Sequence, residues 1–212
     1  MRPLPATAAT DDELYRDWAL GDRRAGSVLV DRYVRPLARF FVNKVASTGD
    51  AEDLTAETLE ILARRLGEFA GRSSVRTWVF AIAHNVLRNH LRRRGGHEPF
   101  DESVHAVASI GPSPITALAR RRELQRLLSA LRAIPLMFQV VLELTYFEQL
   151  SRSEIADALA LPPGTVASRL RRAHELLAIE LGATATDTDA SNLLEMPRWA
   201  AQLREMLTRG AR

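Results

Sequence analysis

The chain has 212 residues, of which 46% are hydrophobic, and this composition indicates a globular protein with one large or two small domains. Its formal net charge is only +3, so an affinity for nucleic acid has to come from local clusters of basic residues. The sequence contains no cysteine, which excludes disulfides, thiolate metal sites and cysteine nucleophiles within it. The N-terminal residues lack the apolar core of a signal peptide, and no apolar run approaches membrane length, so we expect no membrane insertion.

Four helices are expected in the first half of the chain. They cover residues 11–20, residues 22 to about 46, residues 50 to about 66, and residues 74–94. Pro36 is expected either to kink the second helix or to mark a boundary near it, because proline removes a helical hydrogen bond. Asp50 and Ser74 are the expected caps of the third and fourth helices.

The third of these helices carries three carboxylates, Asp53, Glu57 and Glu60, at a spacing that places them on one face. Like charges along one stripe repel each other, so this face makes sense opposite a basic partner. A solvated acidic face is an equally good interpretation, because runs of charge usually mean exposure. Catalytic carboxylates are disfavoured, since no histidine with metal-ligand spacing and no phosphate-binding loop accompanies them.

The fourth helix and the loop before it suit single-stranded nucleic acid. Trp78 shares the helix with Asn85, Arg88 and Arg92, and such a set allows bases to stack and phosphates to pair. The loop over residues 69–74 is small and polar enough to accept an extruded base. Core packing is the alternative for Trp78. The five histidines show no metal spacing and are interpreted as surface or linker residues.

The second half of the chain begins after an expected linker at residues 96–114, which contain glycine, proline, serine and histidine without a helical period. Helical periodicity returns over residues 115–131, and Pro135 is expected to open a further helix that ends near Glu148. A second linker at 182–191 precedes an amphipathic segment at 192–209. Strand signals are weak throughout, so the expected fold class is all-α, with two small helical domains and a C-terminal helical extension.

Residues 151–177 are typical of a helix-turn-helix. Ser151 and Glu154 form a capping box that starts the first helix. The segment Leu161-Pro162-Pro163-Gly164 ends it, and proline suits the first turn of the second helix. Four apolar residues of the second helix should face the core: Val166, Leu170, Ala173 and Leu177. The residues left outside can contact phosphates or base edges: Thr165, Ser168, Arg169, Arg171 and Arg172. An ordinary helical hairpin with a solvated basic face is the alternative.

Four segments, in this order, resemble the extracytoplasmic-function sigma factors, the small two-domain group of the bacterial sigma-70 family. They are residues 50–58 (DAEDLTAET), residues 74–85 (SVRTWVFAIAHN), residues 91–94 (LRRR) and the helix-turn-helix that ends with residues 164–170 (GTVASRL). The resemblance covers about residues 11–181. The sequence departs from the family at Ala160, where glycine is usual in the turn, and an alanine forced to positive φ costs about 1 kcal/mol.

The resemblance implies that the chain directs transcription initiation and catalyses no reaction itself. Residues 11–95 would bind core RNA polymerase and open the promoter −10 element, and residues 115–182 would read the −35 element. The implied polymerase contacts are the three carboxylates of the third helix. The implied −10 contacts are Gly71, Arg72, Ser73, Ser74, Arg76, Trp78, Asn85, Arg88 and Arg92. The implied −35 contacts are the five outward residues of the helix-turn-helix.

The implied partners are bacterial core RNA polymerase and promoter DNA, with an anti-sigma factor as a further one. The resemblance implies that the protein acts in the cytoplasm and uses no cofactor or metal. The alternative function is a helix-turn-helix regulator that binds duplex DNA without polymerase, which leaves the acidic helix and the Trp78 helix unexplained. No set of candidate catalytic residues in the sequence supports a third class, a helical enzyme that acts on nucleic acid. The extension at 183–212 has three interpretations: it packs on the DNA-reading domain, covers a binding face as a lid, or contacts a partner.

Overall fold

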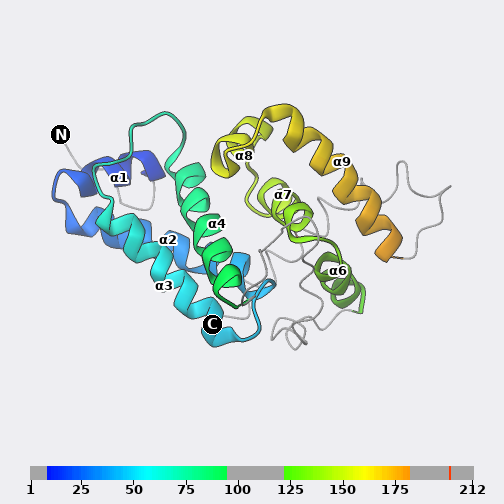
Figure 1. The fold of residues 1–212 in the computed structure, drawn as a ribbon. Helices are drawn as coiled ribbons and strands as arrows, with labels where there is room; N and C mark the ends of the chain where they lie inside the picture. The colour runs from blue at the N-terminus through cyan, green and yellow to red at the C-terminus, as the bar shows by residue number, and fades with distance from the viewer. Residues whose placement is uncertain (1–8, 95–121, 182–200, 202–212) are drawn as a thin grey trace.

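The structure is a computed structural model that describes residues 9–94 and 122–181, together with residue 201. In these ranges it contains eight α-helices and no strand, which confirms the all-α prediction. Four of these helices come from each half of the chain. The two sets form separate groups in Figure 1. The expected linker at 96–114 lies outside the described residues, as does the extension at 183–212 apart from residue 201.

The first group consists of α1 (Asp11–Ala19), α2 (Arg23–Val42), α3 (Thr48–Arg64) and α4 (Val75–Arg94). Thr10 caps α1 in a capping box with Glu13, and Asp22 caps α2. Helix α2 ends at Val42 rather than near residue 46, and Pro36 lies inside it. The alternative in which Pro36 marks a helix boundary is therefore wrong.

The start of α3 also differs from the prediction. Ser47 is the N-cap and accepts a hydrogen bond from the Asp50 amide at 3.0 Å, so Asp50 lies in the first turn and is not the cap. The Asp50 carboxylate instead accepts hydrogen bonds from the Ser47 hydroxyl at 2.8 Å and from Arg94 at 2.9 Å. Ser74 caps α4 as predicted, because its hydroxyl accepts the Thr77 amide at 3.2 Å.

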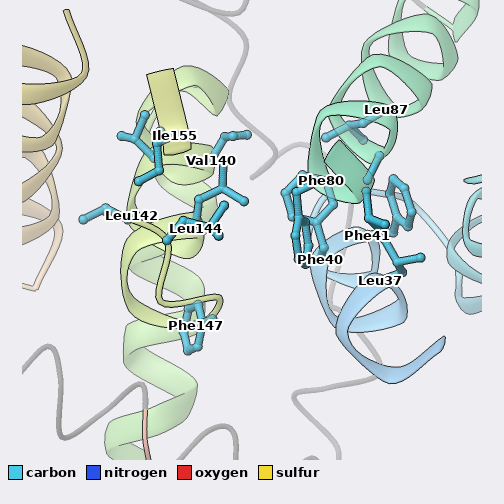
Figure 2. Close-up of a cluster of buried hydrophobic side chains, with 14 of the residues drawn as sticks. Leu37, Phe40, Phe41, Phe80, Leu87, Val140, Leu142, Leu144, Phe147 and Ile155 are labelled. Atoms are coloured by element: carbon cyan, nitrogen blue, oxygen red, sulfur yellow. The ribbon is translucent and has the colours of Figure 1, made fainter. Parts of the chain in front are cut away.

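All four helices contribute to the core of this group, and part of it lies between α2 and α4. On the buried face of α2, Val28 is half-buried and five further residues are below 2% exposed: Leu29, Tyr33, Leu37, Phe40 and Phe41. Phe40 packs edge-on against Phe80 of α4, with ring centroids 5.8 Å apart. Figure 2 shows these rings together with Leu87. Burial of such large side chains is the main force that holds the helices together.

The second group consists of α6 (Arg122–Ala133), α7 (Leu136–Tyr146), α8 (Arg152–Leu159) and α9 (Pro163–Glu180). The predicted capping box of Ser151 and Glu154 is present at the start of α8. Ala160 ends α8 in the left-handed region at φ 52° and ψ 47°, as the turn requires. The four apolar residues expected to face the core from α9 are all buried. Helices α8 and α9 therefore form the predicted helix-turn-helix.

The two groups pack against each other mainly through α4 and α8 (Figure 1). The buried apolar side chains form one continuous cluster that includes Phe80 of the first group and Phe147 and Leu150 of the second. Within it, Figure 2 shows the labelled side chains of α7 and α8 on one side and those of α2 and α4 on the other. The proposed DNA-binding and polymerase-binding residues are thus carried by a single packed body of helices.

Candidate polymerase and nucleic-acid interfaces

The three carboxylates of α3 lie on one accessible face, as their spacing predicts. Asp53 and Glu60 are exposed, and the side chain of Glu57 is 41% exposed. Glu57 lies 3.9 Å from Arg93, and Glu60 lies 3.3 Å from Arg64. Exposed ion pairs of this kind stabilise a fold by only about 0–1 kcal/mol, so they break easily in favour of another partner. The basic partner itself stays a prediction.

The loop between α3 and α4 is shaped by two glycines with positive φ, Gly67 at 95° and Gly71 at 67°. Gly71 and Arg72 are exposed, whereas Ser73 and Ser74 are half-buried. Substituting either glycine would strain the backbone, because other residues rarely adopt these φ values. The loop therefore presents its central residues to solvent on a defined backbone.

Trp78 is half-buried in a cluster of aromatic rings. Its ring centroid lies 5.6 Å from that of Tyr15 and 5.3 Å from that of Phe69. This arrangement supports the core-packing alternative for Trp78, although half-burial leaves part of the indole accessible. Further along α4, Asn85, Arg88 and Arg92 are exposed, on the turns that follow Trp78.

The interpretation of the histidines as surface or linker residues is wrong for at least His84, which is only 6% exposed in the core of α4. His90 and His174 are half-buried, and burial lowers the pKa of both. His174 also shares a hydrogen bond of 2.9 Å with the Tyr146 hydroxyl. The other two histidines lie outside the described residues. Among the described residues, no group of three or more potential ligands is placed to hold a metal ion.

Two proposed −10 residues are engaged by the second helical group. Arg76 donates to the Glu148 carboxylate at 2.7 Å and, through Nε, to the Glu148 carbonyl at 3.0 Å. Ser74 donates to Glu154 at 3.2 Å, and Thr77 lies 3.4 Å from the same carboxylate oxygen. These contacts are made at the start of α4, the part of the first group that is expected to bind single-stranded DNA.

Buried charges between the two groups were missed by the sequence reasoning. Lys44 is fully buried and donates to Glu143, and Arg39 donates to Glu148. Burial disfavours the charged forms of both Lys44 and Glu143. It therefore lowers the pKa of Lys44 and raises the pKa of Glu143. A signal existed for Glu143, because it interrupts the apolar run from Val140 to Leu144. A charge inside such a run points to a buried partner.

The outward face of α9 carries the predicted −35 residues, but two of them are only partly exposed. Ser168, Arg171 and Arg172 are exposed, while Thr165 and Arg169 are half-buried. Arg169 lies three residues after Val166 and four before Ala173, both buried, and therefore at the edge of the buried face. Arg172 pairs with Glu175 at 2.8 Å. The exposed part of this face is polar and basic, and it follows the turn of the helix-turn-helix.

Two protein-family models match the chain in these regions: Sigma-70 region 2 at residues 29–96, and Sigma-70 region 4 at residues 121–177. The RNA polymerase sigma-H factor of Pseudomonas aeruginosa is 33% identical over 181 residues, which cover 81% of this chain and 93% of that protein. The chain belongs to the extracytoplasmic-function subgroup of the sigma-70 family. The ECF RNA polymerase sigma-E factor of Escherichia coli K12 is also similar, at 29% identity over 79% of this sigma factor and 92% of its own length.

Solved structures agree with this assignment. CnrH in complex with the cytosolic domain of CnrY is 26% identical, with a TM-score of 0.62 over 81% of this sigma factor and 97% of that chain. The sigma factor RpoE in complex with the anti-sigma factor NepR, from Bartonella quintana, shares the fold at 23% identity and a TM-score of 0.55, over 76% of this chain and 97% of its own. In the described part of this sigma factor, every helix is too short or too polar to cross a membrane.

Proposed function

We propose that this sigma factor uses its two helical groups for two tasks in transcription initiation. The first group binds core RNA polymerase through Asp53, Glu57 and Glu60 on α3, and it opens the −10 element with α4 and the loop before it. The second group reads the −35 element with the outward face of α9. The chain contributes recognition and positioning, whereas the polymerase performs the chemistry. We place this activity in the cytoplasm, with the polymerase.

The observation that carries the proposal is the helix-turn-helix of α8 and α9 with its exposed basic face. In such motifs the second helix enters the major groove, and its outward residues contact phosphates and base edges. Arg171 and Arg172 supply planar donors that fit phosphate or guanine, and Ser168 supplies a hydroxyl. The region 2 match in the other helical group favours a sigma factor over a regulator that works without polymerase.

Reconstitution tests the function directly. The purified chain is mixed with bacterial core RNA polymerase and a randomised promoter library, and the 5′ ends of the transcripts are sequenced. A sigma factor yields transcripts that start a fixed distance downstream of two shared sequence elements. A regulator that binds duplex DNA alone would give none, although it would still shift labelled DNA. An anti-sigma factor is a further proposed partner, because one of the solved structures described above is a complex with an anti-sigma factor, and the other is a complex with the cytosolic domain of a second protein.

Charge reversal tests the polymerase-binding face. The double substitution Asp53→Lys with Glu57→Lys replaces attraction by repulsion, and we expect core polymerase to bind at least about tenfold more weakly. Asp31→Lys is the control for reversal of a carboxylate elsewhere, since Asp31 is exposed on α2 outside the proposed face. Equal affinities of the double variant and the control in a fluorescence titration would contradict the assignment of this face.

Alanine substitution tests the −35 face. Arg171→Ala and Arg172→Ala should each cost roughly 1–3 kcal/mol if the side chain reads a base, with relaxed preference at one or two positions. A phosphate contact would instead weaken binding to all sequences alike. Arg23→Ala, at the exposed start of α2, is the control for loss of one positive charge. Unchanged promoter selection and affinity in both α9 variants would remove this face from the proposal.

A further inference from the structure

Helix α1 holds both ends of the loop between α3 and α4. At the start of the loop, the Gly67 amide donates to the Tyr15 hydroxyl at 2.9 Å, and the Tyr15 and Phe69 rings pack edge to face at 5.3 Å. At its end, the Asp12 carboxylate accepts the Val75 amide at 2.8 Å. Figure 1 shows the loop passing close to α1. An element outside the matched region 2 segment thus fixes the loop.

The contact made by Asp12 satisfies the first amide of α4. Val75 is the first residue of α4, so its amide has no partner within the helix. A carboxylate at this position satisfies the amide and interacts favourably with the positive end of the helix dipole. Ser74 satisfies the Thr77 amide of the same turn. Asp12 and Ser74 together define the boundary between the loop and the helix.

We propose that Asp12 is a positioning residue for promoter melting: it holds the loop at residues 71–74 in the shape that receives an extruded base. This inference rests on the proposed role of that loop. Extruding a base costs a few kcal/mol, and a pocket that is already ordered loses less entropy when the base enters. Asp12 does not touch DNA in this account, because its carboxylate is occupied by the protein backbone.

The test compares Asp12→Ala, Asp12→Asn and the control Asp17→Ala, which lies exposed on the same helix. Each holoenzyme is assayed for open-complex formation on a promoter selected by the wild-type protein, once as a duplex and once with a pre-melted bubble. We expect Asp12→Ala to slow opening of the duplex about five- to tenfold and to change the bubble template less than about twofold. Asp12→Asn keeps an acceptor oxygen and should behave almost as wild type, as should Asp17→Ala.

Equal losses on both templates would overturn the inference, and so would unchanged opening of the duplex. Asn85→Ala with Arg88→Ala, measured in parallel, separates this inference from the proposed function. If that variant loses duplex opening while Asp12→Ala does not, the melting site stands and the positioning role fails. If wild-type holoenzyme opens no duplex, the proposed function itself fails.

The contacts between the two helical groups carry a second, independent inference. Glu148 is 2% exposed, and its carboxylate binds both Arg39 and Arg76, while Glu154 binds Ser74 and Thr77. Carboxylates and phosphates bind arginine with the same forked geometry. An Arg76 whose Nε and Nη2 donate to Glu148 therefore cannot offer the same forked edge to a DNA phosphate.

We infer that Glu148 and Glu154 occupy the start of α4 in place of DNA, so that the packed chain masks its own −10 surface until the two groups separate. This inference also rests on the proposed −10 role of Arg76 and Ser74. Ion pairs shielded from water contribute little net stability, because desolvation offsets most of the attraction. The ion pairs therefore add little to the cost of separating the two groups, since their charges regain water.

Two dye-labelled cysteines, introduced into this cysteine-free chain, show by energy transfer whether the two helical groups are packed together. Ser27→Cys on α2 and Glu180→Cys on α9 are exposed sites for a donor and an acceptor dye. In this background, Glu148→Gln and Arg39→Gln should both lower the transfer efficiency. Both should also bind labelled oligothymidine roughly three- to tenfold more tightly than the parent chain, because the masked fraction falls.

The two substitutions change the net charge in opposite directions, which makes the DNA measurement decisive. Simple electrostatics predicts weaker binding for Arg39→Gln, whereas unmasking predicts tighter binding. Asp31→Asn is the control that removes one exposed negative charge, as Glu148→Gln removes a buried one. Unchanged transfer efficiency in both variants would overturn the inference, and so would weaker DNA binding by Arg39→Gln. If the parent chain bound no oligothymidine even at low salt, the proposed DNA-binding function would be in question instead.

Discussion

Substitution of Gly26 by alanine should destabilise the protein, although alanine is the better helix former. Gly26 is buried where α1 and α2 meet, and an added Cβ would lie 2.6 Å from Trp18 Nε1 and 2.7 Å from Trp18 Cδ1 and Cε2. Ordinary contacts between such atoms are about 3.5–4.0 Å, so the indole has to move by about 1 Å. Trp18 is half-buried against the core, and this limits how it can yield.

The net effect follows from two opposing contributions. Overpacking of a filled core typically costs about 1–3 kcal/mol, while replacing glycine by alanine in a helix gains about 0.5–1 kcal/mol. We expect a net loss of about 1 kcal/mol for Gly26→Ala, which lowers the Tm of a chain of this length by about 2–4 °C. Gly49 provides the matched control, because a Cβ there meets only the Ser47 hydroxyl at 3.7 Å. Gly49→Ala should therefore raise the Tm.

Thermal unfolding followed by circular dichroism measures both variants. Trp18→Leu combined with Gly26→Ala completes a double-substitution cycle, in which the smaller side chain should remove most of the penalty. A Tm for Gly26→Ala that rises as much as that of Gly49→Ala would refute the reasoning, since it would mean that the indole yields without cost.

Three further predictions concern the second helical group. Ala160→Gly should raise stability by about 0.5–1 kcal/mol in thermal unfolding, because glycine adopts the left-handed conformation at φ 52° without strain. The hydrogen bonds from Ser151 lower the pKa of Glu154 below its ordinary value of 4.5, so its contribution to stability is present above pH 4.5 and is lost as the pH falls through the lowered pKa. The free energy of unfolding of Glu154→Gln, measured by urea titration at a series of pH values, should therefore depend less on pH in that acidic range. Burial lowers the pKa of His174 below 6.5, so the native state loses stability as the pH falls from 6.5 through that lowered pKa, and His174→Phe should remove this dependence.

Local sequence rules located most helices of this protein. The capping box of Ser151 and Glu154 and the apolar period of α9 depend on residues within a few positions of one another, and both are present in the structure. The start of α3 was misplaced because Ser47 and Asp50 are both good N-caps, and local preference does not choose between them. His84 could have been recognised as buried, since it lies four residues after Phe80 and three before Leu87 on the core face of α4.

The contacts between the helical groups could not be predicted in the same way. Lys44 and Glu143 are 99 residues apart in the sequence, and Arg39 and Glu148 are 109 apart. No periodicity links such positions, because their meeting depends on how two folded units dock. The sequence therefore predicted the faces of α3, α4 and α9, but it did not reveal that Arg76 and Ser74 are held by residues of the other group.

The polar character of these contacts has a consequence for synthesis on the ribosome. The first helical group emerges before the second exists, and Phe40, Phe41 and Phe80 can already pack within it. The residues that later dock include Arg39 and Lys44, cations that water solvates well before their carboxylate partners are synthesised. A docking surface that includes these charged residues exposes less apolar surface to aggregation or chaperone capture during translation than a wholly apolar one would. The order of the two groups along the chain thus suits vectorial folding.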